Sequence, residues 1–186
     1  HVAVKNGAAA AVVSSLLEAF PEAAERASND GYMPVHLCIT AKASREVVAM
    51  VLNAFPEAVR AQTNDRDTPL NLASQIYEGT TLPMLEMLLD AYPEAATLAN
   101  SGGSLPLHSV IYWEAPITIV TALLDGYPEA TQRTDNEGRL PVHWIFDASL
   151  AVTKLVTTAF PAGLAAKDNV GDTALTLAAN SENSPI

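Results

Sequence analysis

The sequence predicts an all-α fold, built as a solenoid of stacked helix–turn–helix units, because two markers recur along the chain in step. The first marker is an aromatic residue followed by proline, with the aromatic residue at Phe20, Phe55, Tyr92, Tyr127 and Phe160. The second is a four-residue segment, in most cases with proline second and histidine fourth, that begins at Met33, Thr68, Leu105, Leu140 and Thr173. Both markers advance by 35, 37, 35 and 33 residues, so they belong to one repeating unit.

Each unit is predicted to contain a short helix, a turn, a longer helix and a polar hairpin loop. Proline suits the first position of a helix, where its missing N–H would have no partner. First helices are therefore predicted to begin at Pro34, Pro69, Pro106 and Pro141. The second helix carries apolar residues at helical spacing, as in residues 47–52 and 84–89. It ends before the next aromatic–proline marker, because proline cannot continue a helix interior, and the Glu-Ala that follows can begin another brief turn.

The loops carry turn chemistry, with Asn, Asp and Gly clustered at residues 29–31 and 135–138. Arg66 stands where the loop glycine is expected, so it either takes a positive φ at a cost or marks a loop with a different path. In three repeats an apolar residue replaces the threonine that directly precedes the first helix, which exchanges a capping hydroxyl, worth about 1 kcal/mol, for apolar burial. These residues are Met33, Leu105 and Leu140.

The repeats differ in length at one place. From the fourth residue of the second marker to the next aromatic residue, the chain advances by 19, 21, 19 and 17 residues in successive repeats. We therefore expect insertions and deletions to fall in the turn between the two helices.

These units resemble ankyrin repeats, whose pattern is an Asp-x-x-Gly-x-Thr-Pro-Leu-His start followed by two antiparallel helices and a protruding loop. The last two loops match that start at Asp135, Gly138, Pro141 and His143, and at Asp168, Gly171 and Thr173. The sequence of residues 88–96 is similar to a divergent variety of ankyrin repeat associated with algal and diatom proteins. The resemblance covers the whole chain.

The resemblance implies one domain over residues 1–186, with partial repeats at about 1–32 and 173–186 and fuller ones at 33–67, 68–104, 105–139 and 140–172. Because the terminal repeats are partial, we expect the segment to be a fragment of a longer chain.

Composition bounds the function. With 49% hydrophobic residues, a chain of 186 residues can bury a sizeable core. The single cysteine excludes an internal disulfide framework, and no apolar run reaches the roughly 18 to 20 residues of a membrane span. A net charge of -11 disfavours nucleic-acid binding and would steer a basic partner, although an acidic surface also serves solubility alone.

The histidines could indicate a metal or acid–base site, but all of them occupy one slot of the repeat: His1, His36, His108 and His143. Equivalent slots of stacked helices lie roughly 10 Å apart, too far for shared coordination of a metal. The resemblance implies that this histidine hydrogen-bonds to the backbone and to the neighbouring loop. Asn71 and Thr176 fill the slot elsewhere and can also form hydrogen bonds.

Other residues that could carry catalysis also have structural interpretations. Side chains two residues apart on a helix point in nearly opposite directions, so Cys38 cannot pair with His36, and we expect Cys38 to be a small core residue. A column of glutamates follows the marker prolines, where the N-terminal helix dipole favours negative charge: Glu22, Glu57, Glu94 and Glu129. No phosphate-loop, Gly-x-Ser-x-Gly or His-Glu-x-x-His motif occurs. We expect no enzyme activity, catalytic residue, cofactor or metal site.

The resemblance implies that a partner docks on the concave side, formed by the first helices and loop tips. The positions four and five after the histidine slot should face it: Lys5 and Asn6, Thr40 and Ala41, Gln75 and Ile76, Tyr112 and Trp113, Asp147 and Ala148. The candidate partner-binding residues are Gln75, Tyr77, Tyr112, Trp113 and Asp147. Tyr112 and Trp113 lead because Tyr and Trp are enriched in interface hot spots. The alternative for Trp113 is packing over the turn of the next repeat.

Trp144 is interpreted differently, since it follows His143 in the slot that Leu37 and Leu72 hold in other repeats. We expect Trp144 to lie in the core.

The predicted function is a non-catalytic scaffold that binds a protein partner, with neither nucleic-acid binding nor membrane insertion, and the acidic charge predicts a partner with a basic surface. The acidic face around Glu57, Glu94 and Glu129 is the alternative binding surface. Two other functions stay open: a regulatory or targeting module of a larger enzyme or membrane protein, and a purely structural subunit of a large assembly. We expect an intracellular, cytoplasmic location, with an organelle or the nucleus as alternatives.

Overall fold

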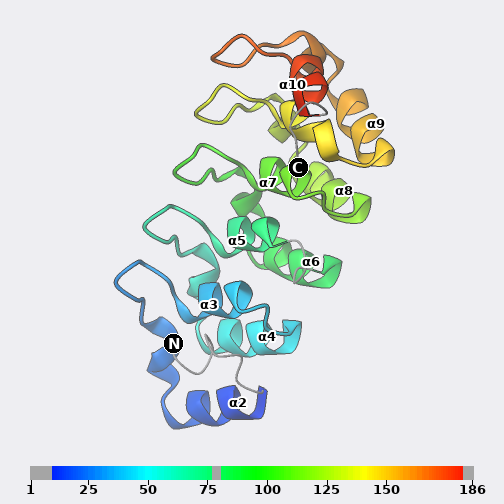
Figure 1. The fold of residues 1–186 in the computed structure, drawn as a ribbon. Helices are drawn as coiled ribbons and strands as arrows, with labels where there is room; N and C mark the ends of the chain where they lie inside the picture. The colour runs from blue at the N-terminus through cyan, green and yellow to red at the C-terminus, as the bar shows by residue number, and fades with distance from the viewer. Residues whose placement is uncertain (1–9, 77–80, 182–186) are drawn as a thin grey trace. The chain divides into compact units, whose positions relative to one another are not determined.

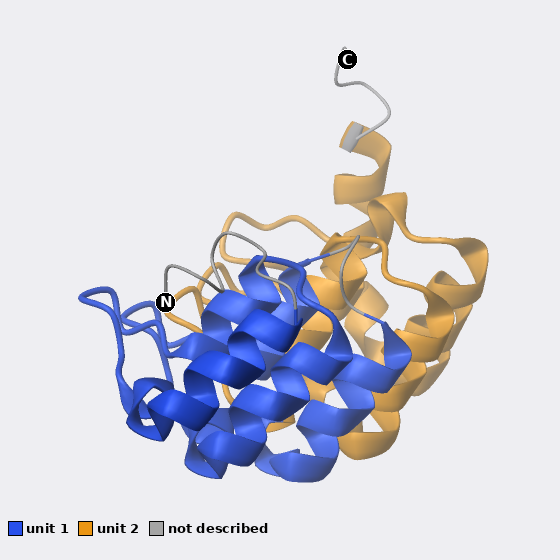
Figure 2. Cartoon of the chain, turned by 90° about the horizontal axis from the view of Figure 1, so that it is seen from below, with its two compact units in different colours: residues 1–95 blue, residues 96–186 orange. Residues whose placement is uncertain are grey.

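The computed structural model describes residues 10–76 and 81–181. In this part of the chain the regular structure consists of α-helices and short 3-10 helices, with no β-strand, which confirms the predicted all-α class. The chain divides into two compact units, residues 1–95 and 96–186 (Figure 2). None of the described helices is both long enough and apolar enough to cross a membrane.

Unit 1 repeats one pattern of a short helix, a longer helix and a 3-10 turn (Figure 1). Its elements are α2 (Ala10–Ala19), η1 (Pro21–Glu25), α3 (Pro34–Thr40), α4 (Arg45–Ala54), η2 (Pro56–Arg60), α5 (Pro69–Gln75) and α6 (Leu82–Ala91), and η3 (Pro93–Thr97) spans the boundary between the units. Helix α3 packs against α4 and α5, α4 also packs against α2, and α5 packs against α6.

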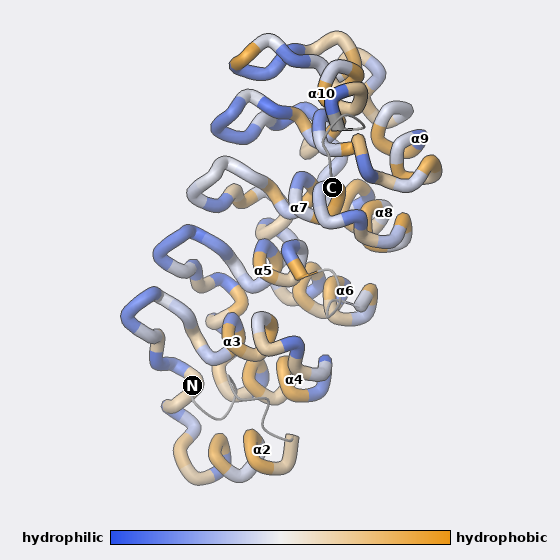
Figure 3. Tube along the Cα trace, in the orientation of Figure 1, coloured by the Kyte–Doolittle hydropathy of each residue, from blue (hydrophilic) through white to orange (hydrophobic). Residues whose placement is uncertain are grey.

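Unit 2 repeats the pattern with α7 (Pro106–Tyr112), α8 (Ile117–Gly126), η4 (Pro128–Gln132), η5 (Pro141–Asp147), α9 (Leu150–Ala159), η6 (Pro161–Ala165) and α10 (Ala174–Ser181). Helix α7 packs against α8 and η5, and η5 packs against α9 and α10. Within each unit, hydrophobic residues gather in the helices and hydrophilic residues in the projecting loops (Figure 3).

The two prolines of each repeat begin helices, as the sequence predicts. Pro34, Pro69, Pro106 and Pro141 are the first residues of α3, α5, α7 and η5. The prolines of the aromatic–proline markers begin η1, η2, η3, η4 and η6, so the brief turn after each second helix is also confirmed. The apolar positions of the second helix form the core, as α4 shows by burying Val47, Val48, Val51 and Leu52.

The turn between the two helices carries the length differences, as predicted. It comprises residues 41–44, 113–116 and 148–149 in three repeats, and six positions separate α5 from α6 in the remaining one, where residues 77–80 lie outside the described part of the chain. The shortest of these turns follows a first helix that differs from the others. The helix that begins at Pro141 is a 3-10 helix and not an α-helix. A 3-10 helix rises about 2.0 Å per residue, against about 1.5 Å in an α-helix, so the same seven residues reach farther toward α9.

The hairpin loops share one geometry. The backbone N–H of Asp135 donates to the carbonyl of Arg139, that of Gly138 donates to Asp135, and the other described loops repeat both bonds. Glycine at the tip takes a positive φ, 75° at Gly138. Arg66 also takes a positive φ, 62°, so the loop keeps its path and a non-glycine residue carries the strain.

Neighbouring hairpins within a unit approach closely at the loop glycine. A Cβ placed on Gly103 would lie 2.6 Å from the backbone nitrogen of Asn136 in the next loop. Gly171 occupies the same slot with a φ of 97°, but no atom of the described residues lies within 4 Å of the corresponding Cβ position.

We predict that Gly103→Ala lowers the free energy of unfolding by more than Gly171→Ala, although both introduce a side chain at a positive φ. Backbone strain of roughly 1 kcal/mol or more is common to both variants. Only Gly103→Ala also forces two hairpins apart. Urea denaturation followed by circular dichroism measures the difference, and equal losses would contradict close stacking of the loops.

Candidate functional site

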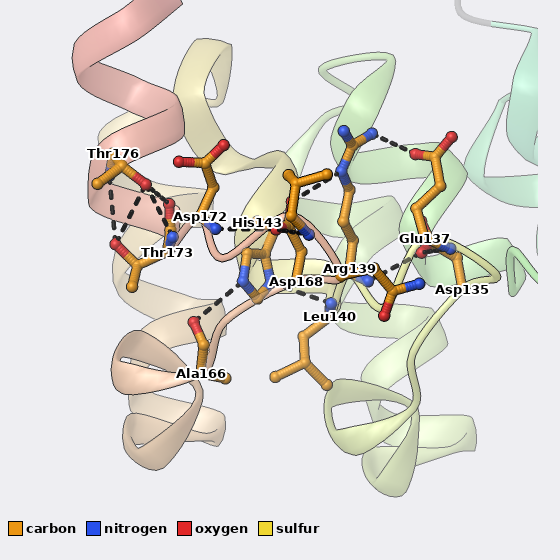
Figure 4. Close-up of polar contacts among 12 residues, drawn as sticks. Asp135, Glu137, Arg139, Leu140, His143, Ala166, Asp168, Asp172, Thr173 and Thr176 are labelled. Atoms are coloured by element: carbon orange, nitrogen blue, oxygen red, sulfur yellow. Dashed lines mark hydrogen bonds and ion pairs between the residues drawn. The ribbon is translucent and has the colours of Figure 1, made fainter.

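A side-chain cap begins each described first helix. The Nδ1 atoms of His36, His108 and His143 accept hydrogen bonds, at 3.0, 3.2 and 3.0 Å, from the backbone N–H three residues earlier. Because Nδ1 is an acceptor, the ring proton resides on Nε2. Nε2 then donates to a backbone carbonyl farther along the chain: Ala61 at 3.2 Å, Arg139 at 3.1 Å and Ala166 at 3.2 Å (Figure 4 shows His143). Each histidine therefore joins a helix start to a later loop, which confirms its structural role; His1 lies outside the described residues.

The repeats without histidine keep the cap by other means. Asn71 Oδ1 accepts from the backbone N–H of Thr68 at 3.0 Å, and the Thr68 hydroxyl accepts from the Asn71 N–H at 3.2 Å. Thr176 Oγ1 accepts from the Thr173 N–H at 2.8 Å. In the other three repeats the residue at the helix start, Met33, Leu105 or Leu140, is buried, so the predicted exchange of a hydroxyl for apolar burial is confirmed.

Burial makes His36 and His108 resist protonation. It lowers the pKa of His36 from 6.5 to about 4, and it also lowers the pKa of His108. A protonated ring would in addition lose the Nδ1 lone pair that caps the helix. The rings of His36 and His108 are thus neutral at physiological pH, with both nitrogens of each ring engaged.

The loop tips form a ladder that the sequence analysis missed. Asn136 Nδ2 donates to the Ser101 carbonyl at 2.9 Å, and its backbone N–H donates to Gly102 at 3.0 Å. Asn169 repeats both bonds to residues 136 and 137, and Asn64 repeats them to residues 29 and 30. A signal was present, because Asn29, Asn64, Asn136 and Asn169 occupy one slot of the repeat.

Arg139 connects two of these loops and reaches an aromatic cluster. Its Nε lies 3.5 Å from Asp168 Oδ2, and its guanidinium also pairs with Glu137 (Figure 4). The guanidinium carbon lies 4.8 Å from the centre of the Trp144 ring, a cation–π geometry. Two carboxylates and one indole therefore share the charge of Arg139.

The cluster, termed here the aromatic patch, consists of Tyr112, Trp113, Trp144 and Phe146 and lies where α7 and η5 end. The Tyr112 ring lies 5.0 Å from that of Trp113 and 5.1 Å from that of Trp144, nearly perpendicular to both. Trp144 and Phe146 are 6.2 Å apart. Tyr112 and Trp113 are 47% and 45% exposed, so half of each large side chain faces solvent.

The prediction that Trp144 lies in the core is wrong. Trp144 is half-buried, and its Nε1 is buried without a hydrogen-bond partner in the described part of the chain. The direction of the Trp144 side chain depends on the 3-10 form of η5, in which successive side chains turn by about 120° and not about 100°. The comparison with Leu37 and Leu72 was also imperfect, because Leu37 is itself only half-buried.

The other candidate residues lie in differing surroundings. Asp147 is exposed at the last position of η5, equivalent to Tyr112 in α7. Gln75 is half-buried, and its Nε2 donates to Asp67 Oδ1 at 2.8 Å, so it supports its own loop. Tyr77 lies outside the described residues. The structure therefore places Tyr112, Trp113 and Asp147 in one region of unit 2.

The remaining residues considered for chemistry have local roles. Cys38 is buried, as predicted, and burial raises the pKa of its thiol to about 12. Glu22, Glu57, Glu94 and Glu129 lie in the first turns of η1 to η4, also as predicted. Within residues 10–76 and 81–181, no three His, Cys, Asp or Glu residues gather closely enough to hold a metal ion.

Comparison with known proteins gives a likeness of fold. No family model matches the sequence, and no curated protein matches it. One similar solved chain comes from the structure of the predatory endopeptidase Bd0816 from Bdellovibrio bacteriovorus in complex with immunity protein Bd3460. It is 16% identical, with a TM-score of 0.80 over 97% of this chain and 90% of that chain. Because 330 solved chains match, the fold is widely shared, and function has to be argued from this chain's own residues.

We predict that His36→Asn removes part of the acid sensitivity of the chain. The ring has a pKa near 6.5 when unfolded and about 4 when folded, so its contribution is complete above pH 6.5 and is lost as the pH falls toward 4. Between about pH 7 and about pH 5 the wild-type chain should lose roughly 2 kcal/mol of stability through this group. Asparagine, which caps α5 at Asn71, has no such titration. Urea denaturation of both proteins at each pH measures the effect, and equal pH slopes would contradict it.

We also predict that Trp144→Leu leaves the free energy of unfolding within about 1 kcal/mol of wild type. In the wild-type chain, burying the indole N–H without a partner costs about 1 to 3 kcal/mol, and the variant removes this cost. The variant also loses the stabilising ring contacts to Tyr112 and Arg139. These effects oppose each other. Thermal or urea denaturation tests this, and a loss of about 3 kcal/mol or more would restore Trp144 to the core.

Proposed function

We propose that this chain is a non-catalytic, ankyrin-type protein-interaction module whose partner contacts the aromatic patch. One observation carries the proposal: Tyr112 and Trp113, side by side at the end of α7, are 47% and 45% exposed. Contiguous exposed apolar patches mark interaction sites, and Tyr and Trp are enriched in interface hot spots because they offer a large area with few rotatable bonds.

Several features support an ankyrin-type architecture. The described repeats combine a capped short helix, a longer helix and a projecting hairpin. The cap joins the start of the first helix to a later loop, which is the role that the family resemblance implies for the histidine. The ladder between loop tips supports repeat stacking within each unit.

The engagement of the reactive side chains supports a non-catalytic role. A general base needs a free lone pair, but the Nδ1 atoms of His36, His108 and His143 each accept a backbone N–H. A nucleophilic cysteine needs a thiolate, but burial raises the pKa of Cys38 to about 12. These groups are committed to holding the fold together.

The comparison with solved structures is compatible with the proposal. The similar chain comes from a structure described as an endopeptidase in complex with an immunity protein, so that protein belongs to a protein–protein assembly. This likeness supports only the use of such a fold in protein binding. The aromatic patch is argued from the residues of this chain.

We predict that the double variant Tyr112→Ala, Trp113→Ala loses partner binding while keeping its fold. Exposed residues contribute little to stability, whereas truncation of a hot-spot aromatic residue costs about 2 kcal/mol or more, roughly a thirtyfold loss of affinity. The measurement is recovery of partners from an extract of the source cells, identification by mass spectrometry, and titration of the purified partner against both proteins.

The matched control is Leu150→Ala, Leu164→Ala, which removes two exposed apolar side chains outside the patch, 69% and 47% exposed. Circular dichroism checks that all three proteins are folded. Equal partner affinity for the wild-type chain and the aromatic double variant would contradict the proposal, and the acidic turns at Glu57, Glu94 and Glu129 would become the better candidate surface.

A further inference from the structure

The aromatic patch is bordered by negative charge that the fold does not neutralise. Glu114 directly follows Trp113, and Asp147 directly follows Phe146; both are exposed. Neither has an ion-pair partner among residues 10–76 and 81–181. Helices α7 and η5 both end at the patch without a basic residue in the last turn, so the partial negative charge at their C-termini adds in the same direction.

Arg139, the cation that contacts the patch, is already engaged. Arg139 lies over the Trp144 ring, and its charge is shared with Glu137 and Asp168. In the described residues no Arg or Lys lies over Tyr112 or Trp113. The patch thus contains one filled cation–π contact beside two exposed rings that lack one.

The choice of tryptophan at position 144 indicates that the patch is not built for stability alone. Two other repeats place Leu37 and Leu72 in this slot, whereas Trp144 buries an indole N–H without a partner. A buried unpaired donor is destabilising. The indole is therefore better explained by the aromatic surface that it completes with Tyr112, 5.1 Å away.

We propose that the patch binds a basic segment of a protein partner, with an arginine side chain placed on the rings of Tyr112 and Trp113. Glu114 and Asp147 supply the negative charge that faces this arginine. The contact of Arg139 with Trp144 is an example, within the chain, of the same pairing of a guanidinium with an aromatic ring. A guanidinium stacks on an aromatic face and keeps two or more N–H groups for carboxylates, which an ammonium does less well. The net charge of -11 favours such a partner and disfavours a second copy of the chain. This inference rests on the proposed function and specifies its partner.

The test is selection of peptides from a random peptide display library on the folded 186-residue chain, with Tyr112→Ala, Trp113→Ala as the counter-selection protein. We expect the enriched peptides to share arginine next to an apolar residue. For one such peptide, replacement of its arginine by citrulline, which keeps the shape and removes the charge, should weaken binding about tenfold or more.

The acidic border is tested with the same peptide. Glu114→Gln together with Asp147→Asn should weaken binding several-fold, and raising the salt from about 50 to about 300 mM should reduce that difference by screening. The matched control is Glu129→Gln, which removes one exposed charge from η4, outside the patch.

The outcomes separate the inference from the proposed function. Peptides that depend on Tyr112 and Trp113 but are acidic or uncharged, or that bind equally well with citrulline, would overturn the basic partner and leave the patch as the binding surface. A selection in which no enriched peptide distinguishes the wild-type chain from the aromatic double variant would overturn the proposed function as well.

Discussion

The hydrogen bond from the backbone N–H at the start of each first helix to the side chain three residues later is the constraint on which the repeat depends. A helix of seven residues is too short to be stable by itself, and its first N–H groups have no partner within the helix. The side chain of His36 satisfies one of these groups and, through its other ring nitrogen, fixes a carbonyl beyond the second helix. Asn71 and Thr176 cap the starts of first helices in other repeats. The position of the helix and the exit of the loop follow from it, and the asparagine ladder then joins adjacent hairpins.

The structural roles of these side chains limit the positions at which the chain can bind a partner. Side chains that cap helices, close loops or fill the core cannot also contact a partner, and these include the histidines, Cys38 and the loop carboxylates. Freedom remains at the ends of the first helices, where Tyr112 and Asp147 occupy one position in adjacent repeats. The patch arises because this position and its neighbours carry large aromatic residues in two consecutive repeats, and because Arg139 extends from its hairpin to the same rings.

Much of the fold could be predicted from the sequence because its signals are local. Proline at fixed intervals sets helix starts through its missing N–H and fixed φ, and Pro34, Pro69 and Pro106 do so as expected. The conformation of Arg66 could not be chosen in advance, because a positive φ and a rerouted loop are both compatible with a missing glycine. Trp144 was misplaced for a similar reason. Its burial was inferred from equivalent residues in α-helical repeats. The helix that carries Trp144 is a 3-10 helix, followed by a turn of only two residues, 148–149, and its side chains point in other directions than those of an α-helix.

The central claim is that a partner occupies the aromatic patch, and hydrogen–deuterium exchange of the chain with and without its purified partner tests this most directly. Bound partner slows exchange where it covers backbone amides or holds local opening closed. The account predicts slowed exchange in peptides covering residues 106–117 and 141–149, with little change in residues 45–60 and 128–132. Slowed exchange confined to residues 56–60 and 128–132, where Glu57 and Glu129 lie, would contradict it.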